Sequence, residues 1–353
     1  MTLTLRVDGD RWRAHLRSVA ETTPGLVPVA KGNGYGFGLG RLARRAQWLQ
    51  GLGLGVGTLA VGLYEELPEV ASRNDGDLLV LTPWRPFHPP VDPALARRVV
   101  HTVSRPDDLA GLLEAQPGAR FVLELATSMR RHGMSAQQLW STGRTLRGAQ
   151  GRLEGVALHL PLAAGGHLPE VERLLTEVVA ADLPARTIWV SHLTRSELDT
   201  LQTSYADLVL RPRIGTDLWL GDRLALRVTS TVLDVHPLRR GDAYGYRGRS
   251  APRDGHLLVV SGGTAHGIGL ESPLGQSGLR ERAKTLARGG MDALGLTRSP
   301  FWVDGKQRLF AEPPHMQASM LFLPDDAIAP AVGDLVDARV RYTATAFDRV
   351  EIG

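Results

Sequence analysis

Cysteine is absent from the 353 residues of this sequence. Its absence excludes disulfide bonds, a thiolate nucleophile and every metal site with cysteine ligands. The chain also lacks an apolar run close to the roughly 20 residues that a membrane-spanning helix needs. Its first residues carry acids early and show no apolar segment typical of an export signal. We therefore expect a cytoplasmic protein that does not interact with a membrane.

A continuous basic stripe is also missing, although the formal net charge is +4. Most of the positive side chains are arginines scattered in pairs among acidic residues, as at Arg44-Arg45, Arg97-Arg98 and Arg239-Arg240. Surfaces that bind nucleic acid normally cluster basic side chains with interleaved aromatic ones. We interpret the pattern as a solvated surface of mixed charge and expect no nucleic-acid partner.

Lysine is nearly absent, because the chain contains only Lys31, Lys284 and Lys306. A sequence that uses arginine for almost all of its cations has no general need for an ammonium group. Lysine differs from arginine because its amine can lose a proton near neutral pH and attack a carbonyl. Lys31 ends the apolar run 27–30, whereas the other two lysines stand in polar segments, so Lys31 is the candidate nucleophile.

Short apolar runs rich in β-branched residues recur along the first two thirds of the chain. The sequence predicts strands at 27–30, 55–61, 77–82, 98–103, 120–126, 155–160, 187–191 and 207–211. Amphipathic segments with helical spacing lie between them, at 40–51, 106–115, 135–148 and 167–181. This α/β alternation predicts a (β/α)8 barrel over residues 1–221, although an open doubly wound sheet would give the same pattern.

The pattern changes after residue 221. Short alternating or apolar segments follow one another, separated by glycine, proline and aspartate turns. Such a pattern is typical of an all-β domain. We therefore predict a second, mostly-β domain over residues 222–353.

The segment 31–38 reads KGNGYGFG and stands between a predicted strand and a predicted helix. In a barrel, loops at this position form the rim where active sites are built. The barrel core would desolvate Lys31 and favour its neutral amine. The glycines let the backbone approach a ligand, and Tyr35 offers a hydroxyl donor to a phosphate. The alternative is a glycine-rich turn whose lysine only extends into solvent.

This segment resembles the motif K-A-N-A-Y-G-H-G around the cofactor lysine of the alanine racemase family, and further matches follow in the same order over most of the chain. The resemblance implies that Lys31 carries pyridoxal 5′-phosphate as a Schiff base and that Tyr35 binds its phosphate. It also implies a homodimer with shared active sites, in which the β domain of one subunit caps the barrel of the other. The nominal substrate is alanine, interconverted between its L and D forms for peptidoglycan biosynthesis.

A second match covers residues 124–133, which resemble K-V-D-T-G-M-G-R-L-G. It implies that Arg131 contacts the phenolic oxygen of the cofactor and the carboxylate of the substrate. A guanidinium group suits both contacts because its donors form a planar fork. Glu124 stands where the family often has a carbamylated lysine that orients this arginine. We hypothesise that Glu124 supplies the same negative charge permanently.

Two further matches concern the pyridine ring of the cofactor. His159 ends a strand that in the family lies near this ring. Residues 213–219 resemble R-P-G-I-A-L-Y, which places Arg213 at the pyridine nitrogen. A permanent cation there keeps that nitrogen unprotonated and disfavours transamination. Arg211 would occupy this position in an alternative register.

Four further residues are candidates for binding the phosphate of the cofactor. The match at residues 213–219 implies that Gly215 gives a backbone N–H, and Thr216 a hydroxyl, to the phosphate. Ser191 or Thr194 is a further candidate, because both lie in the loop after the seventh predicted strand.

The resemblance weakens in the β domain, where residues 263–268 correspond to G-Y-A-D-G-Y. Thr264 takes the position of the family's tyrosine, which is the catalytic acid/base for the second face of the substrate. Threonine does not titrate near neutral pH, so it cannot replace a phenol. His266 lies two residues further on, which in a strand is the same face, and its reference pKa of about 6.5 suits the role. Tyr246 is another possible donor.

Residues 314–317 resemble V-S-M-D, which implies that the backbone of Met316 contacts the substrate carboxylate. Gln317 has lost the acidic group of the family at the next position. His315 is a weak candidate for a metal ligand without a convincing partner, so we predict no metal site.

Three functions are compatible with these features. The first is an amino-acid racemase with Lys31 and His266, or a water, as its two bases. The second is another pyridoxal-phosphate enzyme of the same fold that uses only the lysine face, such as a decarboxylase, a lyase or a metal-aided dehydratase. The third is a protein that binds pyridoxal phosphate but acts through partners, and the loss of the tyrosine at Thr264 favours it.

Overall fold

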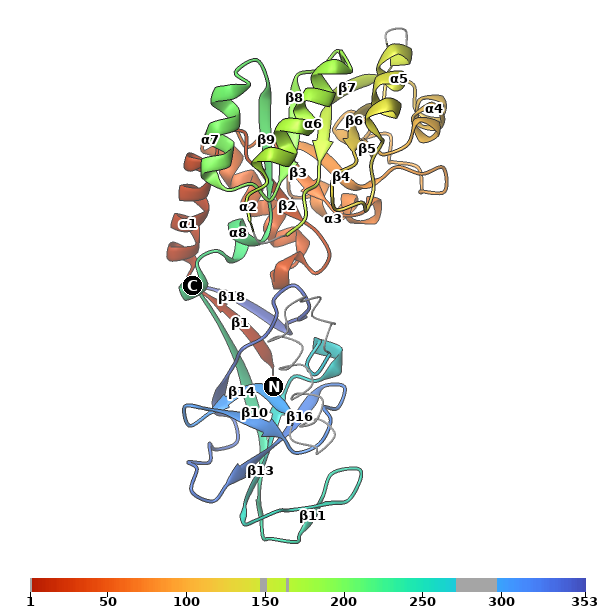
Figure 1. The fold of residues 1–353 in the computed structure, drawn as a ribbon. Coiled ribbons are helices and arrows are strands. Elements are labelled where there is room, and N and C mark those ends of the chain that lie inside the picture. The colour runs from red at the N-terminus through yellow and green to blue at the C-terminus, as the bar shows by residue number, and fades with distance from the viewer. Residues whose placement is uncertain (1, 147–150, 163–164, 271–296) are drawn as a thin grey trace. The chain divides into compact units, whose positions relative to one another are not determined.

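The computed structural model describes residues 2–146, 151–162, 165–270 and 297–353. These residues form two compact units (Figure 1). One unit contains the described residues of Arg13–Gly34 and Gly38–Gly221, and the other those of Met1–Trp12, Tyr35–Phe37 and Asp222–Gly353. Within the described ranges, no helix has the length and apolar character needed to cross a membrane.

The first unit is a closed barrel of eight parallel strands, so the predicted barrel is confirmed over the open sheet. Its strands are β2 (Val27–Ala30), β3 (Thr58–Val61), β4 (Asp77–Pro83), β5 (Val99–Val103), β6 (Arg120–Leu125), β7 (Arg152–Leu158), β8 (Thr187–Ser191) and β9 (Val209–Ile214). Each strand pairs with the next, and β9 pairs with β2 to close the ring. All eight strands fall within or beside the predicted ranges.

Helices surround this barrel, as Figure 1 shows. They are α1 (Gly9–Thr22), α2 (Leu39–Gly51), α3 (Leu67–Ala71), α4 (Pro106–Ala115), α5 (Ala136–Leu146), α6 (Leu168–Ala180), α7 (Arg195–Ser204) and α8 (Thr216–Leu220). Buried side chains of α4 to α7 pack with strand residues in one large apolar cluster between helices and barrel. The four predicted helices at 40–51, 106–115, 135–148 and 167–181 therefore exist, with ends that differ by at most one residue where the structure describes them; residues 147–148 lie outside the described ranges.

A second apolar cluster fills the inside of the barrel. It contains Val27, Val29, Ala60, Leu79, Val100, Val122, Ala157 and Trp189. These side chains come from seven different strands and from no helix, which places them inside the ring. Because both faces of each strand are buried, the strands read as apolar runs rather than as alternating ones.

The second unit contains a mostly antiparallel sheet with the strand order β13-β16-β15-β14-β17-β10-β1-β18. Its strands are β1 (Leu3–Val7), β10 (Leu226–Leu238), β13 (Gly255–Ser261), β14 (Arg298–Val303), β15 (Lys306–Phe310), β16 (Ala318–Pro324), β17 (Leu335–Ala338) and β18 (Arg349–Ile352). A small hairpin of β11 (Ala243–Tyr244) and β12 (Arg249–Ser250) stands apart from this sheet. Strand β13 also pairs with β10, so six of the strands close on themselves.

The N-terminal strand belongs to this second unit, although the predicted barrel domain began at residue 1. Strand β1 runs antiparallel to β10 and parallel to β18, so its backbone groups are paired on both sides. Four of its five residues are buried. The structure thus places residues up to Trp12 with the β sheet. The predicted domain boundary between residues 221 and 222 coincides with the point where the chain passes from the first unit to the second.

Gly155 in β7 gives the first test of this architecture. Its φ of 138° lies in the region that favours glycine, and an added Cβ would collide with the carbonyl oxygen of Thr187 on β8. We expect Gly155→Ala to lower the free energy of unfolding by about 2 kcal/mol or more. Gly57→Ala is the matched control, because nothing lies within 4 Å of a Cβ there. Equal denaturation midpoints in urea for the two variants would contradict this expectation.

Candidate active site

The barrel strands run parallel, so the loops that follow them share one rim, and four of the predicted site residues stand there. Lys31 directly follows β2, and His159 directly follows β7. Glu124 and Arg213 lie next to the last residues of β6 and β9. Four residues that are distant in the sequence are therefore brought to the end of the barrel where active sites of this fold are found.

Glu66 holds the loop that carries Lys31, and no pattern in the sequence indicates this role. Its Oε1 accepts a hydrogen bond from the backbone N of Gly32 at 2.7 Å. Its Oε2 accepts from the backbone N of Gly62 at 2.6 Å and of Leu63 at 3.1 Å. One carboxylate thus ties the loop after β2 to the loop after β3. Charge-assisted bonds of this kind are about twice as strong as neutral ones.

The environment of Lys31 favours its neutral amine. Partial burial lowers its pKa, and the cations of Arg131 and Arg213 lower it further, against the opposing charge of Glu66. The side chain nevertheless stays open to solvent. A lysine with a lowered pKa and an accessible amine is the form that attacks a carbonyl. The predicted nucleophile thus lies in an environment that suits the role.

The structure distinguishes between the two arginine registers. Arg211 donates from Nε to Gly25 O and from Nη2 to Thr58 Oγ1, both at 3.1 Å. Gly25 precedes β2 and Thr58 begins β3, so Arg211 lies at the opposite end of the barrel from Lys31. Only Arg213 is therefore placed where the match at residues 213–219 requires an arginine.

Arg213 is buried and only partly satisfied. Its Nη2 donates to Leu158 O at 2.9 Å, whereas its Nε has no acceptor among the residues that the structure describes. Burial lowers the pKa of Arg213 to about 10, although the charge of Glu124 opposes this. The side chain thus keeps its proton near neutral pH and has one donor available to a ligand.

Glu124 is 5% exposed, and its Oε2 has no hydrogen-bond partner within the described ranges. Burial raises its pKa, while the cations of Arg213, Arg131 and Arg85 act in the opposite direction. Burial therefore works against the permanent negative charge that we hypothesised, and the arginines work for it. The orienting role of Glu124 stays a prediction.

His159 is held as a neutral ring. Its Nδ1 lies 2.9 Å from Ser191 Oγ, and its ring centroid lies 5.3 Å from that of His192. Burial lowers its pKa to about 3, with the cations of Arg213 and Arg131 acting in the same direction. The imidazole is thus uncharged at neutral pH. A neutral ring can pack near a cofactor without changing the charge around that cofactor.

Neither of the two predicted phosphate ligands after β8 has an uncommitted hydroxyl. Ser191 is engaged with His159, as described above. Thr194 caps the N-terminus of α7, where its hydroxyl bonds with Glu197. Gly215 and Thr216 stand at the start of α8, directly after β9. The phosphate-binding roles of all four residues stay predictions.

Strained backbone gathers in the loops that follow the barrel strands. Tyr35, Arg130 and His192 have left-handed φ values of 55°, 50° and 62°. Such conformations cost free energy in residues other than glycine and are concentrated at functional sites. Tyr35 itself is buried within the 3₁₀ turn Gly34–Gly36. Its predicted role at the phosphate is not tested by this conformation.

In the β domain, the structure brings together two of the predicted residues. Thr264 N donates to His315 O at 2.8 Å, and Ala265 N donates to Met316 O at 2.9 Å. Thr264 and Met316 therefore lie on adjacent segments. The close approach requires Gly263, because a Cβ there would collide with His315 O.

The predicted strand at His266 is wrong, because Thr264–His266 form a 3₁₀ turn ended by a left-handed Gly267. His266 is buried, and both of its ring nitrogens have partners. Its Nδ1 accepts from Gly263 N and its Nε2 lies beside Asp348 Oδ1, each at 3.1 Å. The ring thus links this turn to the segment before β18. Its predicted acid/base role stays untested.

Tyr246 and His315 lie next to each other in the same domain. Tyr246 is 87% exposed, and its ring centroid lies 4.7 Å from that of His315. His315 Nε2 also lies 2.6 Å from Glu312 Oε1. Within the described ranges, no group of three or more histidine, aspartate or glutamate side chains is placed to hold a metal ion.

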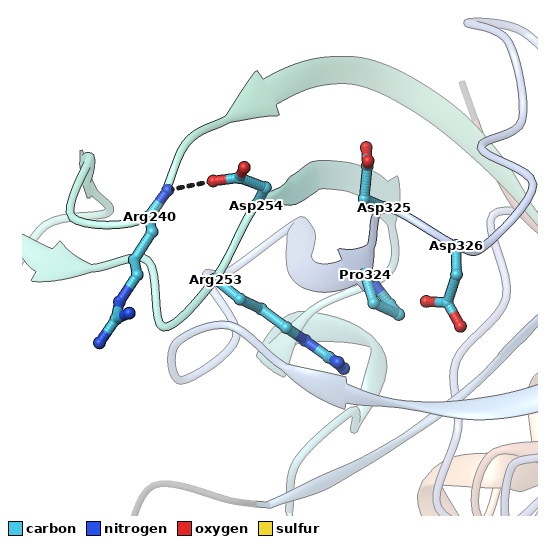
Figure 2. A pocket seen from close by; sticks show the side chains of 6 residues that line it. All are labelled: Arg240, Arg253, Asp254, Pro324, Asp325 and Asp326. Atoms are coloured by element: carbon cyan, nitrogen blue, oxygen red, sulfur yellow. Dashed lines mark hydrogen bonds between the residues drawn. The ribbon is translucent and has the colours of Figure 1, made fainter.

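A further pocket in the β domain contains none of the predicted site residues (Figure 2). It is lined by Arg240, Arg253, Asp254, Pro324, Asp325 and Asp326. The backbone N of Arg240 donates to Asp254 Oδ1 at 2.7 Å, while its side chain extends away from Asp325 and Asp326, as Figure 2 shows. Opposite charges are thus mixed without converging on one point, and we assign no function to this pocket.

Comparison with known proteins finds similarity to alanine racemases. A family model described as "Alanine racemase, N-terminal domain" matches residues 7–211, more than half of the chain. The alanine racemase of Mycobacterium tuberculosis is 29% identical over 268 residues, which cover 69% of this chain and 67% of the relative. The matched region therefore spans about two thirds of each sequence.

Solved structures share the fold at lower identity. The alanine racemase of Bartonella henselae, solved with covalently bound pyridoxal phosphate, has a TM-score of 0.71 at 16% identity and covers 100% of both chains. The histidine racemase of Leuconostoc mesenteroides has a TM-score of 0.67 at 16% identity, covering 99% of this chain and 97% of its own. Similarity at this level of identity establishes the fold of the chain.

Opposing charges around Lys31 lead to a paired prediction. Arg131→Gln removes a cation and should raise the pKa of Lys31, whereas Glu66→Gln removes an anion and should lower it. We expect each midpoint to move by about one pH unit or less. Competitive acylation across a pH series, read by peptide mass spectrometry, measures this midpoint, with the exposed Lys306 as internal reference. Midpoints that stay fixed or move in the same direction would be inconsistent with this electrostatic picture.

Proposed function

The chain belongs to the alanine racemase family, and we propose that it is a pyridoxal-phosphate-dependent amino-acid racemase with Lys31 as its nucleophile. The observation that carries the proposal is the environment of Lys31. Burial and two neighbouring guanidinium groups lower the pKa of an amine that remains open to solvent. This is the only described lysine at the barrel rim, since Lys306 begins β15 in the other unit.

The residues at the rim fit pyridoxal phosphate. Arg213 Nε is buried and has no acceptor among the residues that the structure describes, and a pyridine nitrogen is an acceptor of the required kind. The permanent cations of Arg131 and Arg213 suit a phosphate and a substrate carboxylate. When bound, the cofactor supplies an aldehyde that combines with an amine and a ring that withdraws electrons from an α-carbon.

Each protein group then has a defined task. Lys31 Nζ removes the α-proton of the amino acid on one face, or returns it there. Arg213 keeps its own proton near neutral pH and would hold the cofactor by donating an N–H to its ring nitrogen, which would disfavour protonation of that nitrogen. Arg131 orients the substrate carboxylate with its planar fork of donors. The neutral ring of His159 packs without adding charge. Tyr35, Gly215 and Thr216 are proposed to bind the phosphate.

The finer assignments rest on the resemblance and are part of this proposal. They are L-alanine and D-alanine as substrates, a role in peptidoglycan supply, a cytoplasmic location and a homodimer with shared sites. A histidine racemase has the same fold as this chain, so the fold leaves the substrate side chain open. Loss of the tyrosine at Thr264 favours one alternative, a family member that binds the cofactor without racemising.

Attachment of the cofactor to Lys31 tests the nucleophile. Purified chain mixed with pyridoxal phosphate and reduced with borohydride should gain one stable cofactor mass on the peptide that contains Lys31. Lys31→Ala should lose this mass, because no other described lysine lies at the rim. Lys306→Ala is the control and should keep it, since Lys306 is exposed in the β domain. Labelling that is equal in all three proteins would refute the proposal.

Deuterium exchange at the α-carbon tests the reaction. L-alanine and D-alanine are each incubated with the loaded protein in deuterated water, and the configuration of the deuterated product is determined. Incorporation with inversion supports a racemase. Incorporation with retention only would identify an enzyme that uses the lysine face alone. Bound cofactor without any exchange would support the binding protein instead.

The role of Glu124 leads to a separate prediction. Glu124→Gln keeps the shape of the side chain but removes its charge, so Arg131 and Arg213 lose a nearby anion. We expect pyridoxal phosphate to bind about tenfold more weakly. Glu154→Gln is the matched control, because Glu154 pairs with Arg120 at 2.8 Å, near the start of β6 and β7. A fluorescence titration that gives the same affinity for Glu124→Gln and the unmodified chain would dismiss this role.

A further inference from the structure

A buried carboxylate in the β domain is committed to one histidine. Glu312 is 3% exposed, so its charge has little access to water. Its Oε1 lies 2.6 Å from His315 Nε2, and its Oε2 accepts from the backbone N of Tyr246 at 3.0 Å. A buried carboxylate needs a positive or donating partner because desolvation of a lone charge is costly. Among the described residues, His315 is the titratable group that meets this need.

This pairing fixes which nitrogen of His315 carries a proton. An ionised carboxylate accepts only, so Nε2 must be the donor to Glu312. The other nitrogen, Nδ1, has no hydrogen-bond partner among the described residues, and about a third of the side chain is exposed. Such a ring is oriented by a buried carboxylate through one nitrogen and can exchange protons through the other, as in hydrolase triads.

His266 lacks this freedom. Its Nδ1 and Nε2 are both bonded within the domain, and only 10% of its side chain is exposed. Protonating its Nδ1 would break the bond from Gly263 N. The structure therefore gives the two histidines different tasks, a linking one for His266 and a proton-exchanging one for His315.

His315 also lies directly beside the residues that the proposed site requires in this domain. Its carbonyl oxygen accepts from Thr264 N at 2.8 Å, and it precedes Met316 in the chain. Thr264 occupies the position where the second acid/base is expected, and its own side chain cannot titrate near neutral pH. The titratable group missing from position 264 is thus present on the neighbouring segment.

We propose that His315, oriented by the buried Glu312, is the acid/base for the second substrate face, contributed by the β domain of the other subunit in the proposed homodimer. The assignment rests on the proposed racemase function. In one direction Lys31 Nζ takes the α-proton, and protonated His315 gives its Nδ1 proton to the other face of the same carbon. One C–H bond breaks and one forms, the lysine becomes charged and the histidine becomes neutral. The reverse direction exchanges these roles, so no oxidant or further reactant is needed.

The first measurement needs neither cofactor nor turnover. Nitrogen-15 spectra of the imidazoles in the full chain, with His315 identified by its loss in His315→Asn, report which nitrogen is protonated. The neutral ring should carry its proton on Nε2. Glu312→Gln introduces an amide that can donate to Nε2, so the proton should move towards Nδ1. A His315 ring that is unaffected by Glu312→Gln would overturn the orientation by Glu312.

The second measurement separates the two faces of the reaction. His315→Asn should slow deuterium exchange with inversion by about 100-fold or more, the usual size of a general acid/base contribution, and keep exchange with retention. Glu312→Gln should change the same ratio in the same direction. His236→Asn is the matched control, because His236 is a half-exposed β-domain histidine beside Asp234 and should leave both rates unchanged.

The possible failures are distinguishable. Inversion that persists in His315→Asn but is lost in His266→Asn, with unfolding midpoints unchanged, would overturn our assignment and return the role to His266. Exchange with retention alone in the unmodified chain would overturn it as well, while leaving the role of Lys31 intact. No exchange on either face, or no cofactor on Lys31, would remove the proposed function itself.

Discussion

The chemistry of the barrel rim depends on the partial desolvation of Lys31, to which repulsion from the cations of Arg131 and Arg213 adds. Lys31, Arg131 and Arg213 share this rim with fewer carboxylates than would balance them. A guanidinium group keeps its proton under such repulsion, whereas an amine can release one. Burial and repulsion together therefore favour the neutral amine of Lys31, which is the form that the proposed nucleophile needs. The two guanidinium groups keep their charge and attract anionic ligands, so reactivity and ligand selectivity have a common physical cause.

Repulsion can act in this way only if the backbone keeps the amine in place. Glu66 contributes to this constraint, because it accepts three backbone hydrogen bonds from two loops while its charge opposes the effect of the cations. Glu66 therefore affects Lys31 in two ways. Its hydrogen bonds restrict the loop that carries Lys31, and its charge raises the pKa of Lys31. The left-handed backbone at Tyr35 and His192 adds strain to neighbouring loops, which the closed barrel stabilises.

The sequence predicted the alternating strands and helices and singled out Lys31 as the candidate nucleophile, because both leave local signals, but it did not decide between a barrel and an open sheet. Eight apolar runs mark the strands, and the near absence of lysine makes Lys31 conspicuous. Glu66 leaves no such signal, since its partners are backbone groups of residues as distant as Gly32. Arg211 and Arg213 share one strand face and lie only about 7 Å apart, so the pattern cannot say which of them reaches the rim. Which arginine lies at the rim depends on the register in which β9 pairs with β2 and β8.

The histidines of the β domain show the same limit more sharply. Both His266 and His315 carry an imidazole, but proton exchange requires a ring nitrogen without a partner. His266 loses this freedom to Asp348, 82 residues away, which no local pattern reveals. His315 is paired with Glu312 only three residues earlier, a spacing that is visible in the sequence. What the spacing cannot reveal is that Glu312 is buried. An exposed pair would contribute little, whereas a buried carboxylate holds the ring in one orientation.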